Sequence, residues 1–217
     1  MPALKKLLLK IFFTIFFNIA AFHMQAQPIN GPEGEYYLQG VMETAAGFKL
    51  DPDSSFEFFY SYGALDRSGS GKWSQNGQRV IFNSTPAKGP HFSLLKSSHA
   101  NDEFITIKIV DPNPVFLYAV YASIGTAKSH TDFINNQKGI IRFPKQAADS
   151  ILLLFEFTPE KTASFSIKNS TDNYFEFGFE PWLMEVFFTG LVLEITENGL
   201  KGPLPLLKEG EYLFRKK

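Results

Sequence analysis

The sequence predicts an all-β, antiparallel fold, arranged as a sandwich or a partial barrel in one or two lobes. Short segments alternate between apolar and polar residues with a period of two, which is the strand pattern. Turn-forming dipeptides such as Asn-Gly separate these segments. A five-residue apolar run at 151–155 has the length of a buried strand, and we expect only a short turn of helix, within residues 128–137, beyond the N-terminal segment.

Residues 1–26 have the pattern of a secretory signal peptide. Lys5, Lys6 and Lys10 precede a mainly apolar run of 12 residues at 11–22, and this order of basic and apolar segments is typical of an export signal. The run is shorter than the roughly 20 residues that a membrane-spanning helix needs. We therefore expect a signal helix that is cleaved after Ala26, so that Gln27 becomes the new N-terminus.

The composition limits what the exported product can be. The chain has no cysteine, which excludes thiolate catalysis, thiolate metal sites, disulfide bonds and a lipid anchor on an N-terminal cysteine. Removal of residues 1–26 leaves a net charge of −4, which provides no positive surface for nucleic acid or anionic lipid. We expect a soluble protein, periplasmic or extracellular, with no membrane anchor after cleavage.

The first part of the exported chain, residues 27–100, is predicted to form a meander of strands. In Ser55–Tyr62 the aromatic residues at positions 56, 58, 60 and 62 share one face. The four residues before this strand, Asp-Pro-Asp-Ser at 51–54, suit a type I turn because proline sets φ at its second position.

Asn76-Gly77 is predicted to form a two-residue type I′ turn. Counting outward from that loop places Trp73 opposite Val80 and Gly71 opposite Phe82, with all four on one face. The opposite face then presents polar side chains to solvent: Lys72, Ser74 and Arg79.

The second part, residues 101–217, is predicted to form a sandwich-like lobe, joined to the first by a connection at 85–101. Alternating strands are expected at 104–110, 173–179 and 191–195, and a buried central strand at 151–155. Asn198-Gly199 is expected to form a second type I′ turn.

Residues 34–84 carry a recurring motif order: a strand, a turn at 51–54, an aromatic strand, a loop, Gly71-Lys72-Trp73 and an apolar strand at 80–84. This order resembles a segment of uncharacterised secreted bacterial β-proteins that are likened to lipocalins. The resemblance covers about a quarter of the chain, and it implies a fold element rather than an activity.

Residues 104–157 are similar in rhythm to carboxypeptidase-regulatory and transthyretin-like sandwiches. The pieces that carry this similarity are a strand at 105–110, a loop at 111–114, a second strand at 116–122 and a later strand at 139–144. Those modules are mostly structural, and the similarity implies a structural role.

The segment 63–71 is the best candidate for a binding loop. It is longer than a tight hairpin needs, it is rich in glycine, and it contains Asp66 and Arg67. Long loops on a rigid β-scaffold often carry binding function. With the flanking aromatic residues Tyr62 and Trp73, these make four candidate ligand-binding residues. In the alternative interpretation, Asp66 caps the turn and Arg67 pairs with a neighbouring acid.

No pattern of catalytic residues stands out, so we expect a non-enzymatic exported β-protein with a structural or binding role. The first alternative is a carrier of a small apolar ligand in an aromatic-lined cavity, and a protein partner is also considered. The second is a hydrolase, for which the sequence offers a Ser93-x-x-Lys96 pattern and acids on or beside strands. We expect no cofactor and no metal, because His91, His99 and His130 do not have the spacing of a zinc site.

Overall fold

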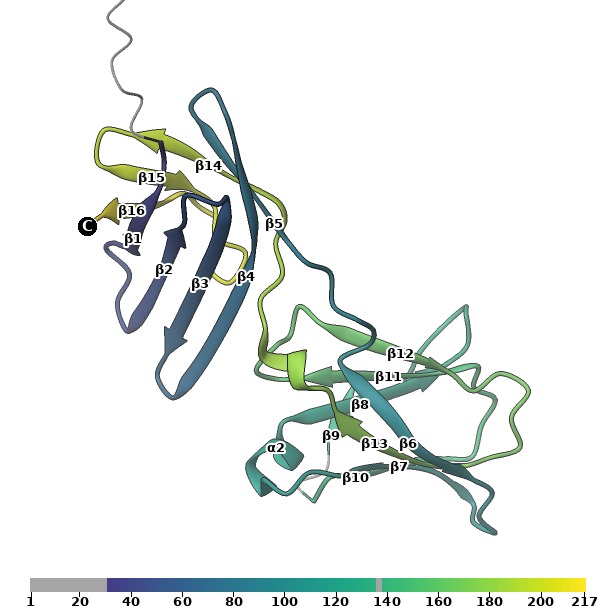
Figure 1. Ribbon diagram of the computed structural model, residues 1–217. Coiled ribbons are helices and arrows are strands. Elements are labelled where there is room, and N and C mark those ends of the chain that lie inside the picture. Colours follow the sequence, from purple (N-terminus) through teal and green to yellow (C-terminus); the bar gives the residue numbers. More distant parts are fainter. Residues whose placement is uncertain (1–30, 136–137) are drawn as a thin grey trace, which may run out of the picture. The chain divides into compact units, whose positions relative to one another are not determined.

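The computed structural model describes residues 31–135 and 138–217, and in this range the chain is built from strands with two short helices (Figure 1). This confirms the predicted all-β class. The predicted signal peptide, including its cleavage residues Ala26 and Gln27, lies outside the described residues.

Eight antiparallel strands close into a barrel, in the order β1-β16-β15-β14-β5-β4-β3-β2. Along the chain, each strand of the barrel pairs with the next one, and β16 closes the circle by pairing with β1. The barrel strands are β1 (Gly34–Leu38), β2 (Thr44–Leu50), β3 (Ser55–Tyr62), β4 (Leu65–Asn76), β5 (Arg79–Ser84), β14 (Thr189–Thr196), β15 (Gly199–Gly202) and β16 (Tyr212–Lys216).

Two four-stranded sheets are formed by the chain between β5 and β14, with strand orders β10-β7-β13-β6 and β12-β11-β8-β9. Their elements are β6 (Phe92–Ser98), β7 (Phe104–Ile109), α2 (Pro114–Tyr118), β8 (Val120–Gly125), β9 (Ile134–Asn135), β10 (Ile140–Pro144), β11 (Ser150–Phe155), β12 (Thr162–Ser166) and β13 (Tyr174–Phe179). A short 3-10 helix, η1 (Pro181–Met184), leads back to the barrel.

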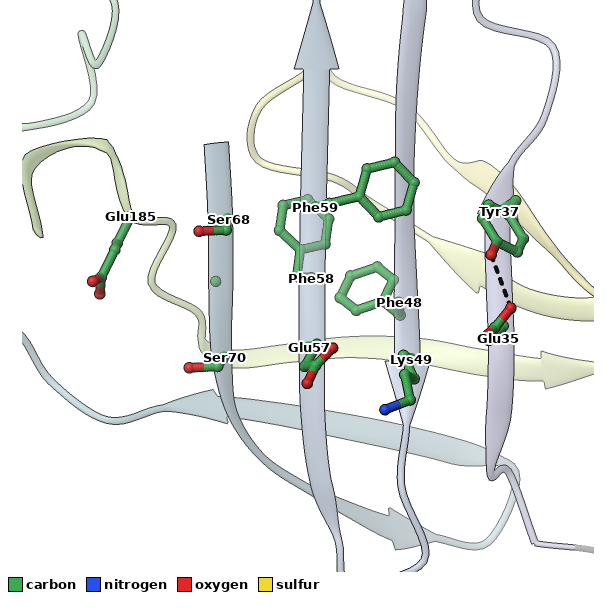
Figure 2. A pocket seen from close by; sticks show the side chains of 11 residues that line it. Glu35, Tyr37, Phe48, Lys49, Glu57, Phe58, Phe59, Ser68, Ser70 and Glu185 are labelled. Carbon is green, nitrogen blue, oxygen red and sulfur yellow. Dashed lines mark hydrogen bonds between the residues drawn. The ribbon is translucent and has the colours of Figure 1, made fainter. Parts of the chain in front are cut away.

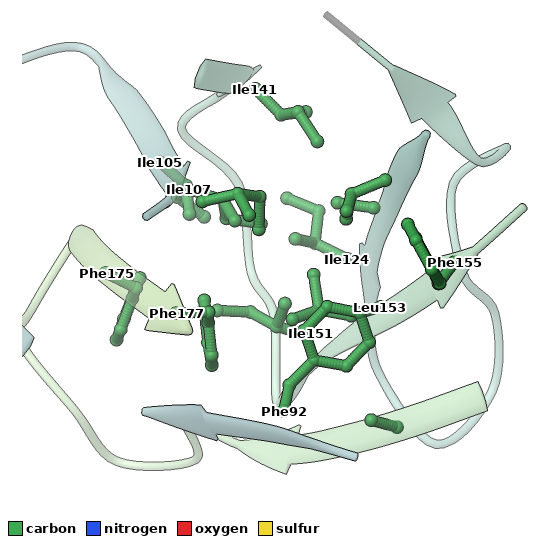
Figure 3. Close-up of a cluster of buried hydrophobic side chains, with 14 of the residues drawn as sticks. Phe92, Ile105, Ile107, Ile124, Ile141, Ile151, Leu153, Phe155, Phe175 and Phe177 are labelled. Carbon is green, nitrogen blue, oxygen red and sulfur yellow. The ribbon is translucent and has the colours of Figure 1, made fainter. Parts of the chain in front are cut away.

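The two parts have separate hydrophobic cores. Both four-stranded sheets contribute to one core, so they pack as a sandwich; Ile107 and Phe177 come from one sheet, and Ile124 and Leu153 from the other (Figure 3). The barrel has its own core, in which about half of the buried residues are aromatic and six are phenylalanine. This explains why the chain can carry so many aromatic residues.

The sandwich is an insertion into the barrel, which differs from the predicted division at residue 100. The barrel takes three strands from the C-terminal part of the chain, and β6, before residue 100, belongs to the sandwich. The amide of Ser84 donates to the carbonyl of Phe188 at 2.8 Å, so the barrel's two chain ends at the insertion are neighbours. Pairing over such a sequence distance leaves no local pattern from which it could be predicted.

The aromatic strand β3 has the predicted bounds and orientation. Phe56, Phe58 and Tyr60 are buried in the barrel, and the intervening residues are more exposed. In the preceding turn, the amide of Ser54 donates to the carbonyl of Asp51 at 3.0 Å, which confirms a turn at 51–54. Ser54 itself has a positive φ of 65°.

The β4–β5 hairpin has a different register from the predicted one. Asn76 pairs with Arg79, so the loop is Gly77-Gln78 and Trp73 lies opposite Phe82 instead of Val80. Only Gly77 has a positive φ, of 61°, which suits a type II′ turn because that turn has glycine at its first central position. The shift moves each pair by two positions and therefore preserves the faces. Lys72, Ser74 and Arg79 are exposed, as predicted.

The Asn198-Gly199 turn also differs, because Thr196 pairs with Gly199 and the loop is therefore Glu197-Asn198. Of these residues only Gly199 has a positive φ, of 147°, whereas a type I′ turn needs positive φ at both central positions.

Three other expectations about local structure are wrong. The region 128–135 contains no helix, and the longer helix of the described chain is instead α2, which Asn113 caps by accepting a hydrogen bond from the Val115 amide at 3.1 Å. The expected connection at 85–101 contains strand β6. The expected loop at 63–71 is mostly strand, since β4 begins at Leu65.

Candidate functional site

Two rows of outward-facing residues cross the first four strands of the barrel side by side. Strand pairing aligns Tyr37, Gly47, Phe59 and Ser68 in one row. It aligns Glu35, Lys49, Glu57 and Ser70 in the next row. Because side chains alternate along each strand, both rows face away from the barrel core. The result is an aromatic row beside a charged row.

Gly47 brings the two aromatic side chains of the first row together. A Cβ at this position would lie 2.6 Å from the Phe59 ring and 2.6 Å from the Tyr36 carbonyl oxygen, so only glycine fits. The ring of Phe59 therefore extends over β2 toward Tyr37 (Figure 2). The two ring centroids are 6.1 Å apart and the rings are inclined at 57°. Both rings stay open to solvent, at 39% exposure for Tyr37 and 41% for Phe59.

Two residues of the charged row, Glu35 and Lys49, have polar or ionic partners. The Tyr37 hydroxyl donates to a Glu35 carboxylate oxygen at 2.9 Å, and this bond lowers the pKa of Glu35. The Lys49 ammonium lies 3.2 Å from Asp51, on the side away from Gly47, and this pairing raises the pKa of Lys49. Lys217 approaches Glu35 at 3.5 Å. These shifts favour the charged forms of Glu35 and Lys49.

Apart from Gly47, the residues of the two rows line a groove of about 540 Å³ on the barrel. Beyond them, its lining includes Gly69 on β4. It also includes Glu185, which Figure 2 labels on the segment that follows η1. The amide of Val186 donates to the carbonyl of Ser68 at 2.7 Å. A Cβ on Gly69 would lie 2.5 Å from the carbonyl oxygen of Val186, so this approach also needs glycine. The groove thus combines residues that lie far apart in the sequence.

Two buried cations fix the segment that carries Glu185. Arg67, on β4, donates from Nε to the Met184 carbonyl at 3.2 Å, and its guanidinium pairs with Glu160. Lys161, between β11 and β12, donates from Nζ to the Leu183 carbonyl at 2.8 Å and also to the Glu185 carbonyl. Burial, and then the charge of Arg67, lowers the pKa of Lys161 to about 8.

The four residues predicted to bind ligand do not form one site. Tyr62 is 51% exposed and lines an open hollow of about 700 Å³ with Thr44 and Ser61. Asp66 is exposed on β4. Arg67 is buried and pairs with an acid, which is the alternative interpretation of that residue. Trp73 is buried in the barrel core, where its indole N–H donates to the Asp51 carbonyl at 3.1 Å.

Sequence reasoning missed the groove, although β3 contains a signal for it. Phe59 is an aromatic residue on the polar face of an alternating strand, beside Glu57 and Ser61. A large apolar side chain at such a position either packs against something or marks a surface for contact. Its partner Tyr37 could not be predicted, because the alignment of β1 with β2 and β3 depends on register.

The other features considered from the sequence do not form a metal site or a helical Ser-x-x-Lys motif in the described residues. In the described residues, no three histidine or acidic side chains gather as a metal site would require. Ser93 and Lys96 lie on strand β6 rather than at the start of a helix. None of the helices in the described ranges has the length and apolar character that crossing a membrane requires.

Comparison with known proteins found no matching family model, no similar curated protein and no similar solved structure. The likeness of residues 34–84 to lipocalin-like segments, and of residues 104–157 to transthyretin-like sandwiches, stays a prediction from sequence motifs.

Proposed function

We propose that this protein is an exported, non-enzymatic binding protein whose contact surface is the groove over β1–β4. The observation that carries this proposal is the pair of exposed rings, Tyr37 and Phe59, set together over Gly47. Exposed apolar area costs about 25 cal/mol per Å² relative to buried area. Two exposed rings side by side on a barrel therefore favour a surface that contacts a ligand over one that serves only the packing of the barrel.

The barrel interior supports binding on the outside rather than inside. The ring of Phe48 lies 4.6 Å from that of Phe82, 4.8 Å from that of Phe58 and 5.2 Å from that of Phe214, measured between centroids. Phe188 packs 5.0 Å from Phe58. These rings occupy the space in which a carrier of an apolar ligand would hold its cargo, so the aromatic surplus is used for packing.

Three of the acids on or beside strands that a hydrolase would use, Glu156, Glu176 and Glu194, are exposed or paired with a cation. Glu156 is exposed, and Glu194 lies 3.8 Å from Arg79 on the barrel surface. Glu176 accepts a hydrogen bond from Tyr174 at 2.6 Å and pairs with Lys108 at 3.1 Å. These contacts favour structural roles for the acids and a binding role for the protein.

The proposal is tested by titrating the isotope-labelled protein with maltohexaose, a lysine tripeptide, an aspartate tripeptide and choline, while amide NMR shifts are followed. We expect one class of probe to shift amides of β1–β4 without being consumed. Phe59→Ala should remove that response, whereas Tyr62→Ala, which removes an exposed ring outside the groove, should retain it. Shifts confined to residues 92–179, turnover of a probe that one substitution abolishes, or no response to any probe would each contradict the proposal.

A further inference from the structure

We propose that the groove over β1–β4 binds an organic cation, with an ammonium group held against Tyr37 and Phe59 and facing the carboxylates of Glu35 and Glu57. This inference rests on the proposed binding function and names the chemistry of the ligand. It follows from the ring geometry, the net charge of the lining and the position of the lysine already present.

The two rings provide the aromatic part of the site. A cation is attracted to the face of an aromatic ring when it lies within about 6 Å of the ring centroid. The centroids of Tyr37 and Phe59 are 6.1 Å apart, so a single small cation can interact with both rings. Gly47 keeps the Phe59 ring in this place, because any larger side chain would push it away.

The lining is negatively charged. It contains three carboxylates, Glu35, Glu57 and Glu185, against one cation, Lys49. In the described part of the chain, no cation lies within ion-pair distance of Glu57 or Glu185. Lys49 and Lys161 act on these two carboxylates only from beyond ion-pair distance. Carboxylates with no cation in direct contact, on a partly apolar surface, attract a positively charged ligand.

The two native cations near Glu35 do not occupy the aromatic row. The Lys49 ammonium lies 3.2 Å from Asp51, which follows the end of β2 and is further from Gly47 along the chain. Lys217 approaches Glu35 at 3.5 Å, but its side chain is 74% exposed, so the pair is weak. In the described chain neither lysine forms a cation–π contact with Tyr37 or Phe59, and both rings are partly exposed to solvent.

The ring geometry favours a compact cation over a sugar. Rings inclined at 57° cannot form the single flat platform on which a saccharide would stack. A rounded ammonium or trimethylammonium group can contact both inclined faces and needs no fixed hydrogen-bond direction. The ammonium could belong to a free quaternary amine or to a lysine side chain of a peptide, and the experiment separates these two sources.

The test uses calorimetry and amide NMR on the full exported chain with choline, a lysine tripeptide and 3,3-dimethylbutanol, the neutral isostere of choline. We expect the cationic probes to bind about tenfold more tightly than the neutral isostere. Tighter binding of choline would assign the site to free quaternary amines, and tighter binding of the tripeptide would assign it to peptide lysines. Added salt should weaken both.

Two variants separate charge from packing. Glu57→Gln keeps the shape and should weaken cation binding several-fold, with no effect on the neutral isostere. Phe59→Leu keeps an apolar side chain but removes the aromatic face, and should weaken cation binding to a similar degree. The thermal unfolding midpoint of each variant shows whether the barrel is intact.

The outcomes distinguish this inference from the broader proposal. Equal binding of choline and its neutral isostere, or unchanged binding to Glu57→Gln, would overturn the cation inference. Binding of maltohexaose alone at β1–β4 would also overturn it, while the proposed binding function would stand. If no probe shifts the amides of β1–β4, both fail.

Discussion

Single residues with unusual backbone demands shape this barrel. Gly47 and Gly69 each allow a close approach that a Cβ would prevent: Gly47 lies against the Phe59 ring, and Gly69 lines the groove against the Val186 carbonyl. Ser54 is a contrasting case, because it occupies a left-handed conformation, with φ of 65°, that glycine adopts more easily. This conformation costs an L-residue roughly 1–2 kcal/mol, a cost that glycine avoids. Glycine loses more conformational entropy on folding, which removes about 0.5–1 kcal/mol of that gain.

Ser54→Gly should therefore raise the free energy of unfolding by about 0.5 kcal/mol, measured by urea denaturation. The matched control is Ser55→Gly, at the first position of β3. The Ser55 hydroxyl donates to the Asp53 carboxylate, and glycine would lose this hydrogen bond. Because φ is not positive at this position, glycine should destabilise the protein. Stabilisation by both substitutions, or by neither, would show that backbone strain at Ser54 does not lower the free energy of unfolding.

At the scale of elements, the segment 182–185 is held in position by two positively charged side chains. Its backbone carbonyls accept hydrogen bonds from Lys161 and Arg67, whose side chains are only 8% and 5% exposed. Other titratable groups nearby are Glu160, Glu185 and His91. Burial of two cations together is unfavourable, and the lowered pKa of Lys161 reflects that cost.

Lys161 should make stability rise with pH above its pKa of about 8. Between pH 8 and 10.5 the unfolded lysine keeps its proton while the folded lysine has lost it, so the free energy of unfolding increases with pH. From pH 7 to pH 9 the increase should be about 1 kcal/mol, measured by urea denaturation at each pH. The window ends below pH 10 because tyrosines with raised pKa, such as Tyr60, contribute with opposite sign above it.

The matched variants are Lys161→Met, which keeps the length of the side chain, and Lys168→Met, which alters an exposed lysine. The first should abolish the rise in stability between pH 7 and 9, and the second should retain it. A rise of equal size in Lys161→Met would assign the effect to another group.

At the scale of the whole molecule, the barrel is interrupted by a sandwich that has its own core. The two ends of the barrel chain that flank the insertion are adjacent. The Ser84 amide donates a hydrogen bond to the Phe188 carbonyl, and β5 pairs with β14 in the antiparallel direction. The insertion therefore stands where a hairpin loop would otherwise connect these strands. Long insertions at such loops cost little, because the loop-closure entropy grows only slowly with length.

A variant in which residues 88–184 are replaced by Gly-Ser-Gly should fold as a barrel. It retains every barrel strand, together with Val186 and Phe188, which belong to the barrel core. We expect a β-type circular dichroism spectrum, cooperative thermal unfolding and retained binding at the groove. Its stability should be lower than that of the full chain, because the buried Arg67 loses its ion pair with Glu160 and its hydrogen bond to the Met184 carbonyl. A non-cooperative melt would show that the barrel needs the sandwich in order to fold.

The sequence by itself determined which residues face inward and which face solvent, because alternation is a local property of a strand. Its prediction for the β4–β5 hairpin kept the correct faces even though the register was wrong by two positions. Only the tertiary structure decided that β14–β16 complete the barrel and that Tyr37, Gly47 and Phe59 align in one row. Pairing partners and register depend on contacts between distant segments, and these contacts leave no periodic trace in the chain.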